Sequence, residues 1–216
     1  SEGARVITAQ RGRDLEFDYI EADFTAAATP ETVVAEVVRR AGKLDILVNN
    51  VGGSARGGPV EMDEDTWQRQ IDFNLTSVYL TCRSVLPHMA EQGRGAIVNT
   101  ASTSGTRWTG AAQCAYAATK AGVIQFSRVV AVEYAPKGVR VNTVVPGQLH
   151  TPMVETRLAG QRMGGDVDAL LASRIKRIPL GWMGDGRDTA NAALFLASDD
   201  ARSITGTELA VDGGMS

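Results

Sequence analysis

Short apolar runs alternate along this chain with longer stretches of helical periodicity. The apolar runs are rich in Val and Ile and are followed by Gly, Asn, Pro or Asp, a pattern typical of buried strands. They predict strands at Arg5–Thr8, Leu15–Glu21, Ile46–Asn49, Ala96–Thr100, Arg140–Val145 and Thr207–Val211. The periodic stretches predict helices at Pro30–Ala41, Asp65–Gln92, Ala115–Ala135 and Thr189–Ala197. Thr29 is the expected N-cap of the first helix, because Pro30 suits the first helical position.

This alternation predicts an α/β fold in which right-handed crossovers build a doubly wound parallel sheet. The nearly continuous apolar run from Asp45 to Asn49 suits a strand that is covered on both faces. No linker or repeat divides the chain, so we expect one domain over residues 1–216. The segment Leu158–Arg177 is less periodic and is interrupted by Gly160, Gly164 and Gly165. Residues 152–183 are therefore expected to form a substrate loop or a small helical lid.

Composition and charge exclude several classes of protein. The net charge is −3 with acidic and basic residues interspersed, which gives no footprint for nucleic acid or an anionic membrane. The apolar runs are too short to span a bilayer, and the N-terminus has no signal-peptide pattern. Cys82 and Cys114 lie far apart without metal-ligand spacing, so neither a disulfide framework nor a metal site is expected. We expect a cytoplasmic protein.

Small polar segments follow three of the predicted strands. They are Asn49–Gly53, Ala101–Gly105 and Pro146–Thr151. In an open parallel sheet, ligands bind outside the carboxyl ends of the strands, and glycines there allow close approach to the backbone. Each segment alone is a weak signal, because glycines after strands usually only form turns.

The strongest chemical candidate is the pair Tyr116 and Lys120 at the start of a predicted helix. A spacing of four places the phenol and the ammonium on one helix face, one turn apart. An ammonium about 4 Å away would lower the tyrosine pKa by about three units at an effective dielectric near 20, before desolvation opposes it. Tyr116 would then suit general acid/base catalysis. An isolated pair of this spacing is usually an aromatic core residue beside a solvated lysine.

Two further side chains support a catalytic interpretation. Ser102 follows a strand and could hydrogen-bond a carbonyl or alcohol oxygen, with Thr103 and Ser104 as competitors for this role. Asn74 falls inside a predicted helix, where asparagine is mildly unfavourable. A functional reason is plausible, and the alternative is an exposed helix asparagine.

The motifs along the whole chain resemble, in order, those of the short-chain dehydrogenase/reductase family. Gly3–Ile7 is similar to the family's second strand, Asp23 to its adenine-side acidic residue, and Leu47–Gly52 to its NNAG element with Val51 in place of alanine. Asn74, Ser102, Tyr116 and Lys120 match the catalytic tetrad, and Pro146, Gly147 and Thr151 match the segment that contacts the nicotinamide carboxamide. Ile204–Gly214 matches the closing strand and turn.

The resemblance implies a Rossmann-type fold and an NAD(P)(H)-dependent oxidoreductase that moves hydride between nicotinamide and a secondary alcohol or ketone. Tyr116 would be the acid/base, Ser102 would orient the substrate, Lys120 would bind the nicotinamide ribose, and Asn74 would hold a proton-relay water. The residues expected to bind the cofactor are Gln10, Arg11, Asp23, Phe24, Asn50, Gly52, Tyr116, Lys120, Pro146, Gly147, Leu149 and Thr151. No metal is required. Family members commonly form dimers and tetramers through two long helices, here near Asp65–Gln92 and Ala115–Ala135, and through the C-terminal strand, so a homo-oligomer is expected.

Three features depart from the family pattern. No GxGxxG or TGxxxGxG occurs in the chain, so the first strand and its Gly-rich phosphate loop are absent, and we expect roughly 25–40 further residues before Ser1. Only Arg11–Asp14 separate the second and third family strands, where a parallel crossover needs a dozen or more residues. The interval from Ser102 to Tyr116 is one residue longer than the family pattern, which keeps Ser104 as an alternative.

Cofactor choice depends on the residue that ends the strand after Gly3. An acidic residue there would bond the ribose 2′-hydroxyl, whereas this position holds Gln10, followed by Arg11 and Arg13. Guanidinium groups suit a 2′-phosphate, so NADP(H) is favoured modestly over NAD(H).

Two rival functions stay open at this stage. The same machinery would serve a dehydrogenase of a cyclic diol or dihydrodiol, and an apolar pocket could be lined by Met153, Met163, Trp182 and Met183. The other rival is a non-catalytic nucleotide-binding scaffold that keeps the fold without turnover.

Overall fold

The computed structural model describes residues 3–12, 16–152, 154 and 166–216. Four parallel strands form the central sheet in the order β3 (Ile46–Asn49), β4 (Gly95–Thr100), β5 (Val139–Pro146) and β8 (Glu208–Val211). A separate parallel pair consists of β1 (Ile7–Gln10) and β2 (Asp18–Glu21). Two short strands, β6 (Leu149–His150) and β7 (Gly184–Asp185), pair beyond the end of β5. The sheet order and strand direction confirm the predicted parallel α/β fold.

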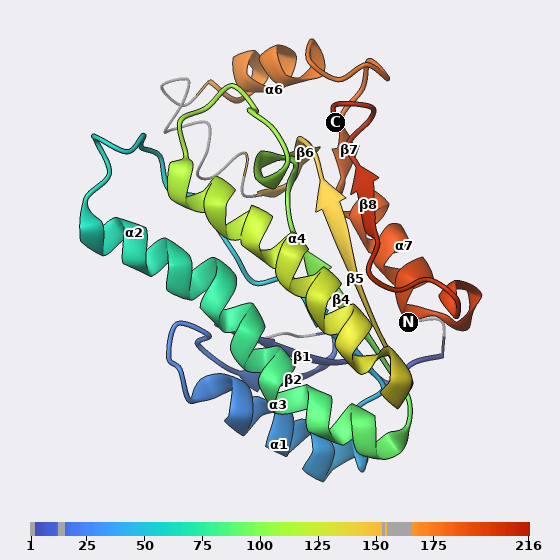
Figure 1. The fold of residues 1–216 in the computed structure, drawn as a ribbon. Helices are drawn as coiled ribbons and strands as arrows, with labels where there is room; N and C mark the ends of the chain where they lie inside the picture. The colour runs from blue at the N-terminus through green and yellow to red at the C-terminus, as the bar shows by residue number, and fades with distance from the viewer. Residues whose placement is uncertain (1–2, 13–15, 153, 155–165) are drawn as a thin grey trace.

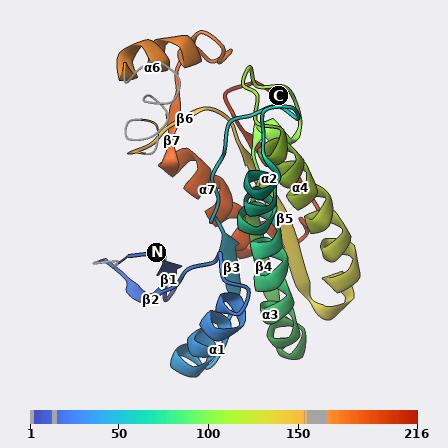
Figure 2. The ribbon, with the colours of Figure 1, turned by 90° about the vertical axis from the view of Figure 1, so that its left-hand side faces the viewer.

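Helices cover both faces of the central sheet (Figures 1 and 2). On one face lie α3 (Ser77–Gln92) and α4 (Cys114–Tyr134), with α1 (Thr29–Ala41) packed against α3. On the other face lies α7 (Gly186–Ala197), while α6 (Val167–Ile175) stands apart beyond the carboxyl ends of the strands. The helix α2 (Glu64–Ile71) continues through a π-helical turn at Asp72–Thr76 into α3. The candidate catalytic residues therefore lie in three places: Asn74 in the π-helical turn, Ser102 just after β4, and the pair Tyr116 and Lys120 in α4.

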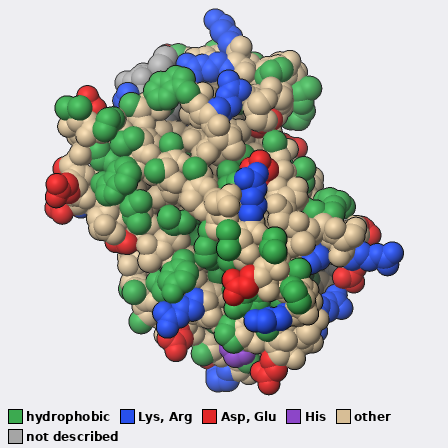
Figure 3. All heavy atoms as spheres, in the orientation of Figure 1, with side chains coloured by type: hydrophobic (Ala, Val, Ile, Leu, Met, Phe, Trp, Pro, Cys, Tyr) green, Lys and Arg blue, Asp and Glu red, His purple; other side chains and the backbone are tan. Residues whose placement is uncertain are grey.

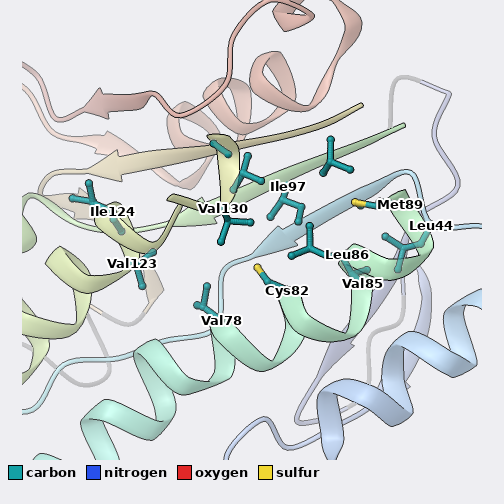
Figure 4. Close-up of a cluster of buried hydrophobic side chains, with 14 of the residues drawn as sticks. Leu44, Val78, Cys82, Val85, Leu86, Met89, Ile97, Val123, Ile124 and Val130 are labelled. Atoms are coloured by element: carbon teal, nitrogen blue, oxygen red, sulfur yellow. The ribbon is translucent and has the colours of Figure 1, made fainter. Parts of the chain in front are cut away.

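Two core clusters flank the sheet, one on each face, and a third small cluster joins Val154 to Leu170 of α6. The larger lies between the sheet and helices α3 and α4 and includes Val78, Cys82, Val85, Met89, Ile97, Val123 and Ile124 (Figure 4). The smaller consists of Val98, Val144 and Leu196 and joins the sheet to α7. Successive strand residues point to opposite faces, so Ile97 and Val98 enter different clusters. Burial raises the pKa of the Cys82 thiol to about 12, which makes it a core residue rather than a nucleophile.

Most predicted elements are confirmed, with shifts at their ends. The strand at Ile46–Asn49 is placed as expected, and those predicted at Ala96–Thr100, Arg140–Val145 and Thr207–Val211 move by one residue at one or both ends. The strand predicted at Arg5–Thr8 is instead Ile7–Gln10, and the one predicted from Leu15 begins at Asp18. Thr29 as N-cap was wrong, because Ala28 precedes the first helix and makes no side-chain cap. Here Pro30 sets the helix start without capping, since its fixed φ suits the first turn.

Strand β3 is less covered than its sequence predicted. Ile46 and Val48 are 42% and 49% exposed, although a buried parallel strand was expected. Among the residues that the structure describes, no backbone pairing joins β3 to β1, so β3 is an edge of the four-stranded sheet. The apolar sequence of β3 is typical of a strand covered on both faces. In the described residues, the Leu47 side of the strand packs against the larger core cluster. The expected residues before Ser1 stay a prediction.

The short link between β1 and β2 is longer than the sequence suggested. Residues 11–17 join the two strands, of which 13–15, including Arg13, lie outside the described residues. The strands nevertheless pair in parallel, with Ile7 opposite Asp18. In the predicted lid, Met153, Met163 and the glycines at 160, 164 and 165 also lie outside the described residues. The described part of that segment contains the helix α6, which the sequence left open as a loop or lid.

Candidate active site

Tyr116 and Lys120 lie in the first two turns of α4, where the chain enters the helix from Gln113. The Lys120 ammonium nitrogen is 5.7 Å from the centre of the Tyr116 ring. Lys120 is only 3% exposed, and its ammonium donates a 2.8 Å hydrogen bond to the Thr100 carbonyl at the end of β4. A buried ammonium has three donors, so this bond leaves two of them for a ligand.

Ser102 is the serine that reaches Tyr116. Its hydroxyl lies close enough to the Tyr116 phenol to lower the pKa of that phenol, and it also caps the short turn Thr103–Gly105 by accepting from the Ser104 amide at 3.2 Å. The Ser104 hydroxyl is engaged elsewhere, because it accepts a 2.6 Å hydrogen bond from the Gln113 side-chain amide and bonds Thr109. Thr103 is the first residue of the same turn and is buried. The geometry therefore favours Ser102 over both competitors.

Asn74 lies in the π-helical turn and is fully buried, which contradicts the alternative of an exposed helix asparagine. Its side-chain amide pairs with Gly53 at two points: the oxygen accepts from the Gly53 amide at 2.9 Å, and the nitrogen donates to the Gly53 carbonyl at 3.0 Å. The nitrogen also donates to the Gln70 carbonyl at 3.0 Å. π-helical turns are frequent at functional sites, and this one holds the loop after β3 against the helix.

Gly52 shows how closely these groups approach one another. A Cβ built at Gly52 would lie 2.9 Å from the Asn74 amide oxygen and 3.2 Å from the Lys120 nitrogen. Only a residue without a side chain fits there without displacing both groups. The loop after β3 thus brings its backbone directly over the buried lysine.

The pKa values correct one expectation. Burial raises the pKa of Tyr116, and the hydrogen bond from Ser102 lowers it by less. The expected lowering by Lys120 was wrong for the free protein, because the ammonium sits against the ring and bonds Thr100 rather than the phenol oxygen. Burial also lowers the pKa of Lys120 to about 8. Both shifts have the same physical cause, which is the loss of water around a group that would carry charge.

Most of the expected cofactor residues lie at the carboxyl ends of four parallel strands. Gln10 and Arg11 follow β1, Asp23 and Phe24 follow β2, and Asn50 and Gly52 follow β3; Pro146, Gly147, Leu149 and Thr151 end or follow β5. The Arg11 guanidinium is 4.0 Å from the Asp23 carboxylate and 5.9 Å from the centre of the Phe73 ring. Two hydrogen bonds from Thr25 lower the pKa of the Asp23 carboxyl. Asn50 is exposed, and no described contact ties it to Tyr116.

These residues fit the two ends of a nicotinamide dinucleotide. Across the described ranges no carboxylate lies within ion-pair distance of Lys120, so its buried charge lacks a protein counterpart. A ribose with two hydroxyl acceptors suits such a group. The polar cluster around Arg11 and Asp23 suits the adenosine end. The sequence contributes no Gly-rich loop for the pyrophosphate between them.

Some residues of this region serve the fold rather than a ligand. Asn49 of the NNVG element donates to Asn99 at 2.8 Å and accepts from Thr81, and Asn99 donates to Ser127. Gly147 packs against Asp212, where an added Cβ would lie 2.6 Å from the Asp212 Cβ. A glycine at this position is therefore required by the fold independently of any cofactor.

A cavity of about 320 Å³ opens beside the segment after Gly147. Gln148, Leu149, Trp182 and Asp188 are among its lining residues, and Tyr116 and Lys120 are not. Trp182 thus lines this cavity, and Met183 is not among its lining residues. This hollow adjoins the carboxyl ends of β5 and β8.

Sequence reasoning missed Gln70 and Gln113. Gln70 is 8% exposed and accepts a 3.1 Å hydrogen bond from the Ala55 amide, and Gln113 is 7% exposed and holds Ser104. A signal for Gln70 was present, because it stands four residues before Asn74 and so shares its helix face. No comparable pattern marked Gln113, which lies in a loop.

Comparison with known proteins supports the family that the sequence motifs resemble. A family model described as enoyl-(acyl carrier protein) reductase matches residues 2–216. The 2-keto-3-deoxy-L-fuconate dehydrogenase of Xanthomonas campestris is 36% identical over 87% of this chain, which spans 62% of that enzyme's length. The 2,5-dichloro-2,5-cyclohexadiene-1,4-diol dehydrogenase of Sphingobium indicum is 38% identical over 92% of this chain and 75% of its own.

Two solved structures share the fold. A protein from Burkholderia xenovorans described as a short-chain dehydrogenase/reductase is 62% identical, with a TM-score of 0.87 over 91% of this chain and 74% of its own. The aldohexose dehydrogenase of Thermoplasma acidophilum is 31% identical, with a TM-score of 0.93 over 99% and 85%. The chain therefore belongs to the short-chain dehydrogenase/reductase family of oxidoreductases. Within the described residues, no helix is long and apolar enough to cross a membrane, and no three His, Cys, Asp or Glu side chains are grouped so that they could hold a metal ion.

Proposed function

We propose that the chain is an NADP(H)-dependent oxidoreductase that interconverts a secondary alcohol and a ketone, with Tyr116 as the acid/base. The observation that carries this proposal is the proximity of two groups to Tyr116: Ser102, just after β4, and Lys120, one turn further along α4. Tyr116 exchanges a proton with the substrate oxygen, and Ser102 hydrogen-bonds the same oxygen. When bound, the nicotinamide cofactor supplies or accepts the hydride.

Lys120 and Asn74 support this exchange in different ways. The two spare donors of Lys120 bind the nicotinamide ribose, and its positive charge favours the phenolate once the site is closed to water. Asn74 fixes the backbone at Gly53 and so keeps Gly52 over Lys120. By its resemblance to the family, Asn74 would also hold a water in the proton relay. Pro146, Gly147, Leu149 and Thr151 would line the nicotinamide end.

The preference for NADP(H) rests on Arg11. Its exposed guanidinium stands at the end of β1, beside Asp23 and above Phe73, where it can meet a 2′-phosphate. Gln10 brings no negative charge that would repel the phosphate. Dissociation constants for NADPH and NADH test this preference, and tighter binding of NADH would contradict it.

The substrate class is a secondary alcohol on a polar carbon framework. Relatives named for a deoxy sugar acid, a cyclohexadiene diol and an aldohexose support it. The relative that acts on a cyclic diol favours a second candidate, a diol dehydrogenase with the same machinery. A 3-oxoacyl thioester is a further candidate substrate, since a 3-oxoacyl-[acyl-carrier-protein] reductase from Chlamydia pneumoniae is 38% identical.

A substrate panel tests the function directly. The panel contains one sugar acid, one cyclic diol, one aldohexose and one 3-oxoacyl thioester, each with NADP(H) and NAD(H) at neutral pH. We expect a change in absorbance at the reduced-nicotinamide band with at least one alcohol or ketone. Tight cofactor binding without turnover on any member would favour the non-catalytic scaffold instead.

We also propose a cytoplasmic homodimer or homotetramer that associates through α3 and α4. Figure 3 shows hydrophobic side chains scattered over the face that these helices present. Tyr79, Val129 and Val132 on this face are 45%, 56% and 76% exposed, and Tyr79 makes an edge-to-face contact with Phe126. Burying these three side chains against a second copy would remove apolar surface from water, which favours association through this face.

A further inference from the structure

Gln70 is a buried amide that no catalytic motif of the chain requires. It lies in the last turn of α2 and is 8% exposed, although glutamine is usually found at the surface. Its side-chain oxygen accepts a 3.1 Å hydrogen bond from the Ala55 amide, in the loop that follows β3. The same oxygen is 3.4 Å from the Asn74 side-chain nitrogen. Gln70 therefore connects the helix that carries Asn74 to the loop that passes over Lys120.

The segment Gly53–Gly57 is anchored at every second residue. Asn74 holds Gly53 at two points, and Gln70 holds Ala55. Gly57 donates to the Ala112 carbonyl at 3.1 Å and accepts from the Cys114 amide at 3.1 Å. The segment thus begins next to Gly52, which lies over the buried Lys120, and ends at Gly57, which bonds Cys114 two positions before Tyr116.

The segment therefore ends against the residues that lead into α4, the helix that carries Tyr116. The two ends of the segment are fixed by the backbone bridge at Gly57 and by Asn74, and the middle is fixed by Gln70. Without an acceptor at position 70, the Ala55 amide would be left unpaired unless the segment moved toward water. Ser54 and Arg56, which flank Ala55, would move with it.

We infer that Gln70 is a positioning residue that sets the segment Gly53–Gly57 as one wall of the substrate cleft. This inference rests on the proposed function. The alternative is that Gln70 stabilises the fold and has no effect on substrate binding. Gln70 touches neither Tyr116 nor Lys120 in the described contacts, so it acts on the reaction only through the segment it holds.

The experiment compares Gln70→Met, which keeps the chain length and removes the acceptor, with Gln70→Glu, which keeps an oxygen there. Gln68→Leu is the matched control, because Gln68 is exposed on the same helix and bonds only Asp72 in the described contacts. Amide hydrogen exchange reports on Ala55 without any substrate. Steady-state kinetics uses the panel substrate that the unchanged protein converts most efficiently.

We expect Gln70→Met to raise the exchange rate of the Ala55 amide at least tenfold and the KM about tenfold, with kcat within threefold. Gln70→Glu and Gln68→Leu should stay within threefold in all three quantities. Unchanged exchange at Ala55, or faster exchange with an unchanged KM, would overturn the inference. If Gln70→Met does not fold, Gln70→Ala replaces it under the same criteria. A protein that converts no panel substrate contradicts the proposed function, while the exchange at Ala55 still decides whether Gln70 holds the segment.

Discussion

At the scale of single residues, the site is governed by burial. Tyr116 and Lys120 both lose water, and burial opposes charge on each of them. The spacing of four predicted their shared helix face, but it could not predict that the lysine would bond the Thr100 carbonyl rather than the phenol. The sequence shows the spacing of Tyr116 and Lys120. The electrostatic interaction between them depends on side-chain directions and on neighbours far along the chain, which the spacing does not show.

The lowered pKa of Lys120 makes stability depend on pH. Its folded pKa is about 8, below the ordinary 10.5, so between these values the unfolded chain binds more protons than the folded one. The cost of burying the charged lysine is therefore present in full below pH 8 and is relieved as pH rises toward 10.5. Relative to Lys120→Met, which does not titrate, the unchanged protein should gain about 3 kcal/mol over this range.

Urea unfolding at a series of pH values measures this difference. The exposed Lys137→Met is the control and should show no comparable gain. A difference between the unchanged protein and Lys120→Met that stays constant from pH 7 to about 10.5 would mean that the lysine is solvated in the folded state.

At the scale of elements, hydrophobic periodicity predicted the strands and long helices because burial decides them. It missed what depends on specific hydrogen bonds. The π-helical turn at Asp72–Thr76 interrupts a stretch whose periodicity is continuous, and Asn74 stabilises it by bonding Gly53 in a distant loop. Ala28 rather than Thr29 precedes α1 because Pro30 fixes the helix start. The short strands β6 and β7 are too brief to leave a periodic signal.

Arg140 links β5 to the end of α7. Its guanidinium donates to the carbonyls of Leu196, Ala197, Ser198 and Ile204. The last carbonyls of a helix lack partners within the helix, so this single side chain caps α7. Arg140→Met should lower the free energy of unfolding by roughly 2–4 kcal/mol, because buried carbonyls lose a charged donor.

Denaturant titration tests this cap. Arg202→Met, at an exposed position near the same end of α7, should change the free energy of unfolding by less than about 0.5 kcal/mol. Equal effects of the two substitutions would show that Arg140 contributes no cap.

At the scale of the whole molecule, the order of the motifs was enough to predict the family, the single domain and the parallel sheet. It was not enough to predict how much of the sheet the described chain covers. Ile46 and Val48 are exposed because no described strand pairs with that edge of β3 and only one face is packed. The cleft wall at Gly53–Gly57 was also beyond prediction, since its anchors come from α2, the π-helical turn and the stretch before α4.

Association through α3 and α4 is the prediction that belongs to this scale. Light scattering should give the mass of a dimer or tetramer, and Val132→Glu should shift it toward the monomer, because a buried unpaired carboxylate disfavours the contact. Val60→Glu, at a site 90% exposed in the loop before α2, serves as the control and should leave the mass unchanged. A monomeric unchanged protein would contradict the proposed assembly.

The proposed catalysis depends most directly on the hydroxyl of Tyr116. Tyr116→Phe keeps the ring against Lys120 and removes the proton donor, so kcat on the best panel substrate should fall about 10²–10⁴-fold. Tyr134→Phe, at the other end of α4, should leave kcat within about twofold of the unchanged protein. A Tyr116→Phe protein that retains turnover within about tenfold of the unchanged enzyme would contradict the assignment of Tyr116 as the acid/base.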